Sequence, residues 1–190
     1  HNENKYVFNC MNTDKICIFT DTGKMHTIKA VDIPLGRFRD KGTPVDNLSN
    51  YDSSQERMLY VAPVGQLRSD RLLFVTKTSM CKLVEGAEFD VAKRTIASTK
   101  LADEDELIFI GSASEMEQIV LQSHGGCFLR FLTQEVSTMK KTALGVRGMK
   151  LADDDYLEHA YLLAGHQEYT ISYHDKEYAL NKVRLAKRDT

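Results

Sequence analysis

The sequence has no long hydrophobic run. Its apolar stretches are short, as in residues 16–19, 72–75 and 108–110, whereas a helix that crosses a bilayer needs about 20 consecutive apolar residues. The amino end, residues 1–5, is polar and lacks the apolar segment of a secretory signal. We therefore expect no membrane-spanning segment and no membrane partner.

Cysteine pairs and an excess of positive charge are also missing. The four cysteines form no C-x-x-C pair and mostly lie in apolar segments, where a thiol behaves as a small hydrophobic group. This pattern favours reduced cysteines in the cytoplasm. The 25 lysines and arginines are outnumbered by 27 aspartates and glutamates, which gives a net charge of -2. Binding of nucleic acid through overall positive charge is therefore disfavoured, and any DNA site must come from local segregation of charge.

The composition is that of a folded protein. Of the 190 residues, 42% are hydrophobic and 27% are charged, which separates the chain from disordered sequences. A chain of this length can bury a core without disulfides or metals. We predict a single domain over residues 1–190, built either as one compact unit or as a small array of repeats.

Internal repeats organise the whole chain. Residues 100–107 (KLADEDEL) return as residues 150–157 (KLADDDYL), displaced by 50 positions. Apolar segments that flank a small turn recur in residues 16–28, 72–84, 119–131 and 169–181, and each predicts a β-hairpin. Residues 112–122 are predicted as a loop followed by a strand. Approximate repeats of 5–56, 57–106, 107–156 and 157–190 follow, and several short strands in units of this length favour a propeller blade over a helical repeat.

A basic pair follows the second strand of three hairpins. The pairs are displaced by 47 residues from one another, and the first repeat has three basic residues in the corresponding loop. A single pair of this kind is as compatible with a solvated surface as with a binding site, but recurrence at a fixed interval favours one shared face. The residues are Arg37, Arg39 and Lys41, then Lys93 and Arg94, Lys140 and Lys141, and Lys187 and Arg188.

Other polar clusters give little support to catalysis or metal binding. The acidic residues 103–106 and 153–155 fall at the same point of the repeat and lack the glycine and closing glutamate of an EF-hand, so we interpret them as turns between blades. The histidines lack zinc spacing, and no G-x-S-x-G motif is present. We predict no metal site and no catalytic residue, and we interpret the tyrosines as packing residues.

At these motifs the chain resembles the C-terminal domains of the A subunits of bacterial type IIA topoisomerases, DNA gyrase and topoisomerase IV. The likeness begins in residues 14–25 (DKICIFTDTGKM), an apolar strand ending in Phe-Thr, a turn with glycine, and a returning strand with basic residues. It continues through Ile33-Pro34, residues 41–44 (KGTP) and residues 145–151 (GVRGMKL). The resemblance implies an all-β fold, a propeller-like β-pinwheel with about four blades present, in a disc that is incomplete or open.

One motif of the gyrase members is absent. Their Q-R-R-G-G-K-G box does not occur, and the nearest segment, residues 36–42 (GRFRDKG), keeps only the charge and the final Lys-Gly. This favours a subunit similar to that of topoisomerase IV, or a gyrase fragment without its box. The sequence leaves both identities open.

The resemblance implies a function in binding, bending and wrapping double-stranded DNA, as an accessory to DNA topological change. We predict the basic residues of the repeated loops, together with Arg147, as contacts to the DNA backbone. Basic residues on or near the returning strands are weaker candidates, because half of them point away from a shared face. These weaker candidates are Lys24, Lys29, Lys82, Arg130, Lys182 and Arg184.

The resemblance also implies partners and a cellular context. The partners are the topoisomerase B subunit and the catalytic core of the same polypeptide, in a cytoplasmic, chromosome-associated enzyme. ATP and Mg²⁺ belong to other parts of that ATP-dependent isomerase, so no cofactor and no catalysis are expected in this fragment. The alternative is a propeller module that binds another protein, for which the basic loops supply only solubility.

Overall fold

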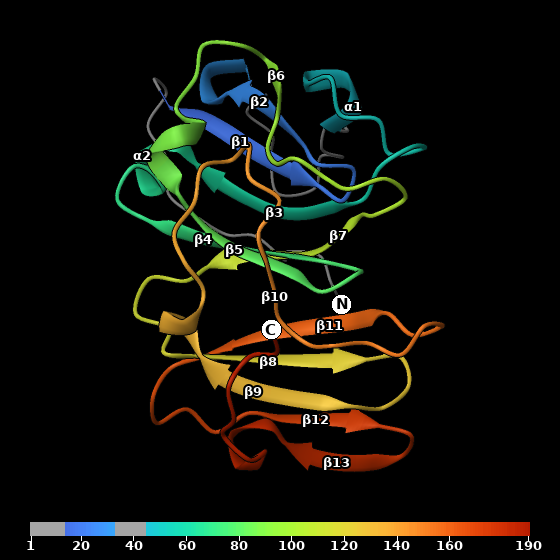
Figure 1. Ribbon diagram of the computed structural model, residues 1–190. Helices are drawn as coiled ribbons and strands as arrows, with labels where there is room; N and C mark the ends of the chain where they lie inside the picture. The colour runs from blue at the N-terminus through green and yellow to red at the C-terminus, as the bar shows by residue number, and fades with distance from the viewer. Residues whose placement is uncertain (1–13, 33–44) are drawn as a thin grey trace.

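Most of the regular structure is β-strand. The computed structural model describes residues 14–32 and 45–190 (Figure 1). The strands are β1 (Lys15–Thr20), β2 (Lys24–Lys29), β3 (Met58–Pro63), β4 (Arg71–Thr76), β5 (Met80–Glu85), β6 (Thr95–Ala97), β7 (Leu107–Ser112), β8 (Gln118–Ser123), β9 (Phe128–Leu132), β10 (Val146–Arg147), β11 (Leu157–Leu163), β12 (Thr170–Tyr173) and β13 (Lys176–Ala179). The helices are single turns: α1 (Val45–Leu48), α2 (Val64–Leu67) and the 3₁₀ turns η1 (Ala30–Asp32), η2 (Gly86–Phe89), η3 (Thr133–Glu135) and η4 (Leu180–Lys182). The predicted all-β class is confirmed.

All four predicted hairpins are present as antiparallel pairs: β1 with β2, β4 with β5, β8 with β9, and β12 with β13. Each turn contains a residue with left-handed φ: Gly23 at 78°, Ser79 at 72°, Gly126 at 93° and Asp175 at 61°. In the last hairpin the turn consists of His174 and Asp175, because Tyr173 and Lys176 already pair in the ladder. The loop and strand predicted in residues 112–122 are confirmed, since β8 begins at Gln118.

The strands form four sheets, which we call blades 1 to 4. Their strand orders are β3-β1-β2-β6 in blade 1, β10-β5-β4-β7 in blade 2, β11-β8-β9 in blade 3 and β12-β13 in blade 4. In the first three blades, one repeat supplies the central hairpin and the next repeat supplies the flanking strands. The predicted repeat boundaries stay a prediction, because a sequence repeat and a blade are different units in this fold.

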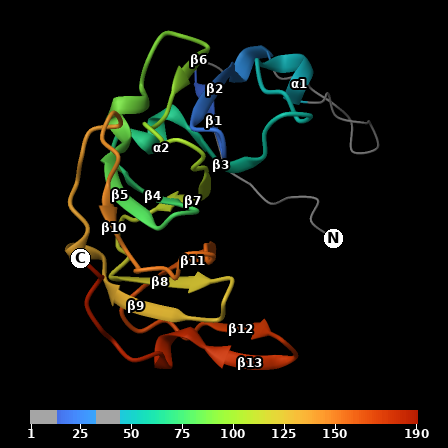
Figure 2. The ribbon, with the colours of Figure 1, turned by 45° about the vertical axis from the view of Figure 1, so that its right-hand side comes forward.

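The blades have an inner and an outer edge. The edge strands β3 and β7 contact each other, and β7 contacts β11, so one edge of each of blades 1 to 3 faces its neighbours. These three strands follow one another on the concave side of an arc (Figure 2). The opposite edges are formed by β6 in blade 1 and β10 in blade 2, which pair with the returning strands β2 and β5. The outer edge of each of these two blades is therefore built by the repeats that follow it.

Hydrophobic side chains fill the spaces between successive blades. Phe19 of blade 1 meets Phe74 of blade 2 edge to face, with 6.2 Å between ring centroids, and meets Phe89 of η2 at 5.0 Å. A second cluster joins Leu73 of blade 2 to Leu121 of blade 3. All of these side chains are buried. Apolar burial across the blades is the main term that holds the array together.

The acidic octets cap the hairpin turns of their own blades. Asp105 accepts hydrogen bonds from the backbone N of Thr78 at 3.1 Å and from its Oγ1 at 2.6 Å. Asp155 accepts one from the backbone N of Gly125 at 2.9 Å. Desolvation raises the pKa of the Asp155 carboxyl, but its backbone N–H donors outweigh this and hold that pKa below its usual value. In blade 1, Glu56 takes the same place and accepts a hydrogen bond from Thr22.

Asp105→Ala is expected to lower the free energy of unfolding by about 1–2 kcal/mol, because two donors of Thr78 lose their acceptor. The measurement is urea unfolding followed by circular dichroism. Asp103→Ala is the matched control, since this exposed carboxylate forms no hydrogen bond with a described residue. Equal effects of the two substitutions would show that Asp105 acts only through its charge.

Candidate nucleic-acid interface

The predicted basic pairs occupy equivalent loops. Lys93 and Arg94 lie between η2 and β6, and the second pair lies between η3 and β10. The third pair follows η4 at the same interval. Each loop leaves a 3₁₀ turn of one blade and leads toward the outer edge of the preceding blade. The repeat therefore places basic residues on successive outer edges. The sequence predicted the interval between these residues but not their position at the outer edges.

The outer edge is the convex side of the arc. The segment that leads into β10 and the C-terminal end of the chain both run along this side, opposite β3, β7 and β11 (Figure 2). Arg147 lies in β10 itself, and its side chain is exposed. The structure therefore brings the second and third pairs and Arg147 to one side of the molecule. Arg37, Arg39 and Lys41 lie outside the described residues, and their part in the site stays a prediction.

The second residue of each later pair is tied to the fold. Lys141 donates its backbone N to Glu88 Oε1 at 3.3 Å and its Nζ to the Glu88 carbonyl at 3.3 Å. Arg188 repeats this pattern one blade later: its N bonds Glu135 Oε1 at 3.1 Å and its Nε bonds the Glu135 carbonyl at 3.0 Å. Both pairs of partners are 53 residues apart. These two side chains therefore anchor their loops to the neighbouring 3₁₀ turns.

The first residue of each pair is presented to solvent. Lys93, Lys140 and Lys187 are exposed, and their side chains form no hydrogen bond or ion pair with any described residue. Arg94 and Arg147 are exposed as well, and each guanidinium donates one hydrogen bond to a described residue, from Arg94 to the Leu48 carbonyl at 3.2 Å and from Arg147 to the Thr190 carbonyl at 3.3 Å. Within the three described pairs, these lysines are thus the residues whose side chains no described residue engages.

The weaker candidates for DNA contacts differ in how far their side chains are exposed to solvent. Lys24 and Lys29, at the two ends of β2, are exposed, as are Lys182 and Arg184. Arg130 is half-buried, and it donates to Gln118 Oε1 at 2.7 Å and to the Val183 carbonyl at 2.7 Å. The prediction of Lys82 as a DNA contact is wrong, because its side chain is buried within the protein.

Two lysines of the octets were missed by the sequence reasoning. Lys100 and Lys150 are exposed and begin the repeated octets. The backbone N of Lys100 bonds the Lys141 carbonyl at 3.1 Å, and that of Lys150 bonds Asp189 Oδ2 at 2.7 Å. Each therefore lies beside the basic loop of the following repeat. Their identical position, as the first residue of each octet, is the sequence signal that could have identified them. The sequence interpretation used only the acidic residues of the octets.

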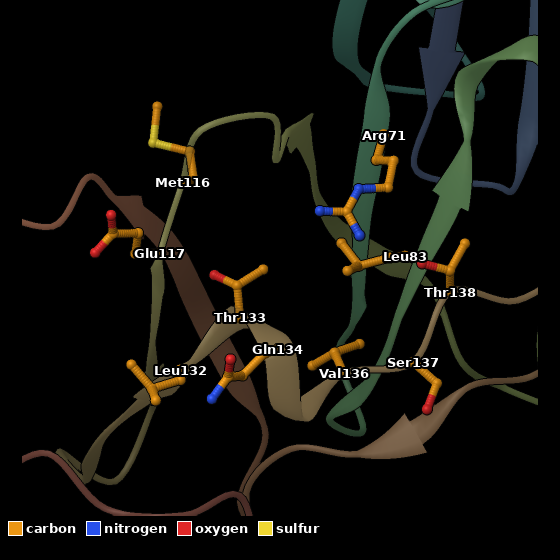
Figure 3. A pocket seen from close by; sticks show the side chains of 10 residues that line it. All are labelled: Arg71, Leu83, Met116, Glu117, Leu132, Thr133, Gln134, Val136, Ser137 and Thr138. Carbon is orange, nitrogen blue, oxygen red and sulfur yellow. The ribbon is translucent and has the colours of Figure 1, made fainter.

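Several hollows lie near the basic loops. One of about 510 Å³ has Ile96, Lys100 and Lys141 among its lining residues. A larger one of about 650 Å³ lies between blades 2 and 3 (Figure 3). Arg71 extends into it beside Leu83, while Glu117 lies on the other side. The larger hollow is lined by one cation, one carboxylate and mostly apolar or hydroxyl side chains. These residues do not form a catalytic set of acid, base and nucleophile.

A family model for the DNA gyrase C-terminal domain, a β-propeller, matches residues 14–53, 70–114 and 117–164. The chain belongs to this family. Its relatives are the C-terminal domains of the A subunits of gyrase and topoisomerase IV, as the resemblance predicted. Within the described residues, no helix is long and apolar enough to span a membrane.

Curated A subunits of both DNA gyrase and topoisomerase IV match the chain. The DNA gyrase A subunit of Ureaplasma parvum is 27% identical over 179 residues, which cover 91% of this chain and 21% of the relative. The gyrase A subunit of Salmonella typhimurium is 31% identical over 144 residues, covering 75% and 16%. The DNA topoisomerase 4 A subunit of Bacillus subtilis is 29% identical over 153 residues, covering 79% and 19%. The chain thus spans about a fifth of the length of such relatives.

Solved structures confirm the fold. The crystal structure of the C-terminal domain of DNA topoisomerase IV superposes with a TM-score of 0.83 at 24% identity, covering 93% of this chain and 57% of that one. The DNA gyrase A C-terminal domain gives a TM-score of 0.68 at 22% identity, covering 94% and 59%. The predicted β-pinwheel is therefore confirmed, and the choice between gyrase and topoisomerase IV stays open.

Proposed function

We propose that this chain is a DNA-binding domain that bends or wraps duplex DNA along its convex side, as an accessory of a type IIA topoisomerase A subunit. The observation that carries the proposal is the recurrence of exposed cations on successive outer edges. Lys93, Lys140 and Lys187 follow equivalent 3₁₀ turns at intervals of 47 residues. A repeated fold thereby presents positive charge at regular steps around a curve.

Such an arrangement suits the backbone of DNA. Each cation that neutralises a phosphate releases a condensed counterion, so the contacts contribute to binding without reading base sequence. The net charge of -2 does not oppose this, because the sum of charges says nothing about their placement, and seven of the 27 acidic residues lie in the octets, where Asp105 and Asp155 cap hairpin turns. Local charge at the outer edge then determines the attraction.

Bending requires several blades to act together. Deforming a short duplex by 40–90° costs about 1–6 kcal/mol by elastic estimates, more than one exposed ion pair contributes. Cations on consecutive blades supply the additional contacts that a curved path permits. The proposal therefore predicts that binding and bending are lost together when the charges of several loops are removed.

The remainder of the role follows from the family. We assign no cofactor and no catalysis to this domain, and we place ATP and Mg²⁺ in other parts of the enzyme. Its partners would be double-stranded DNA, the B subunit, and the catalytic core of the same polypeptide, in a cytoplasmic and chromosome-associated complex. The named relatives are gyrase and topoisomerase IV subunits, which supports this context.

The test is a titration of a fluorescent duplex of about 40 base pairs at several salt concentrations. We expect affinity that does not depend on sequence and a logarithmic salt slope of about -4 to -5, as for roughly five phosphate contacts. Dyes on the two duplex ends report bending through energy transfer. Affinity that is flat with salt, or no binding at low salt, would contradict the proposal and favour a propeller that binds another protein.

A further inference from the structure

Lys82 is a buried cation that serves a neighbouring repeat. It is the third residue of β5 and is only 2% exposed. Its Nζ donates to the carbonyl of Lys141 at 2.8 Å and to that of Ala143 at 2.6 Å. The ring of Phe74 lies beneath the ammonium, 5.7 Å from Nζ to the centroid. Burial of a charge is costly, so an ammonium at this position calls for a role that an apolar residue cannot fill.

The bonds of Lys82 define the shape of a basic loop. Ala143 N bonds the Lys140 carbonyl at 3.0 Å, which closes a tight turn over residues 140–143. Lys82 reaches two carbonyls of this turn from inside, and the backbone N of Lys100 reaches one of them from the preceding octet. The exposed side chain of Lys140 therefore projects from a turn that is fixed by an internal cation.

Blade 1 has a related contact at the equivalent position. His26 is the third residue of β2, as Lys82 is of β5, and it is also 2% exposed. Its Nδ1 lies 2.9 Å from Thr95 Oγ1. Thr95 directly follows Lys93 and Arg94 in the chain. In two blades, then, a buried polar side chain at the same strand position bonds the segment that carries the basic pair.

We infer that Lys82 is a positioning residue for DNA binding, which orders the loop of residues 140–143 and adds positive charge beneath it. The inference rests on the proposed function. Lys82 touches no DNA in this arrangement and acts through Lys140 and Lys141. A loop held in one conformation loses less entropy when it binds a phosphate. Removal of the two hydrogen bonds from Lys82 should therefore weaken DNA binding without removing any exposed charge.

The test compares Lys82→Met with Lys77→Met. Both remove one lysine charge, but Lys77 is a turn residue whose side chain is 41% exposed and forms a 3.7 Å ion pair with Glu106. In Lys82→Met we expect amide exchange in residues 141–144 to accelerate at least about 10-fold and duplex affinity to fall about 5- to 10-fold. In Lys77→Met both quantities should stay within about 2-fold of the wild type.

The outcomes separate the inference from the proposed function. Unchanged amide exchange in the loop of Lys82→Met, with duplex binding by the wild type intact, overturns the inference alone. Failure of the wild type to bind duplex overturns the proposed function and with it the DNA role of Lys82. Faster exchange together with weaker binding supports both.

A pH series gives a readout that needs no variant. Burial lowers the pKa of Lys82 to about 8, against the opposing charge of Glu88 on η2. Among the described residues, the charged side chain of Lys141 also belongs to this site, since its Nζ bonds the Glu88 carbonyl at 3.3 Å. Because charge-assisted hydrogen bonds are the stronger ones, loop exchange measured relative to β5 amides should rise from pH 7 to pH 9 as the ammonium loses its proton. A constant ratio over this interval overturns the inference.

Discussion

Replacing Lys93, Lys140 and Lys187 together by alanine is expected to lower the affinity for duplex DNA on the order of 10- to 100-fold at moderate salt. The salt slope should become shallower by roughly 2 to 3, since each lost phosphate contact removes about 0.9 from it. Energy transfer between dyes on the duplex ends should report a straighter DNA. The measurement is the titration at several salt concentrations, repeated with the variant.

The stability of that variant should hardly change, because the three lysines are exposed and form no side-chain hydrogen bond with a described residue. The matched control replaces Arg57, Lys77 and Lys176, whose side chains reach solvent beside the hairpin turns and away from the outer-edge strands. It removes the same net charge and should leave affinity within about 3-fold of the wild type. Equal losses in the two variants would show that binding follows net charge, with no special part for the outer edge.

Phe19→Ala is expected to lower the free energy of unfolding by about 3–5 kcal/mol. Phe19 is 0% exposed and packs against Phe74, Phe89 and Tyr60, so its removal opens a cavity where blades 1 and 2 meet. Because each blade of a repeat array is stabilised by its neighbours, the loss should reach beyond blade 1. Urea unfolding followed by circular dichroism measures it.

Val31→Ala is the control for this substitution, since Val31 is 64% exposed and should change stability by less than about 0.5 kcal/mol. A loss below about 1.5 kcal/mol in Phe19→Ala would mean that the surrounding side chains collapse into the space. The aromatic cluster would then not be what joins the two blades.

The local features of this fold could be predicted from the sequence. Hairpin strands need only a few alternating or apolar residues around a turn, and Gly23 and Gly126 meet the left-handed φ that such turns require. The octets and basic pairs recur at fixed intervals because each repeat must solve the same packing problem. Spacing alone therefore indicated four hairpins, turn-forming acidic segments and equivalent basic loops.

Contacts between repeats decided what the sequence left open. β6 and β10 are too short to be recognised by pattern, and they form only because the outer edges of β2 and β5 accept them. Lys82 and Lys140 are the same residue type, yet Lys82 is buried under carbonyls about 60 residues away while Lys140 is exposed. Periodicity determined which units repeat, whereas long-range packing determined which cations anchor the loops and which face outward, since burial depends on neighbours that are distant in the chain.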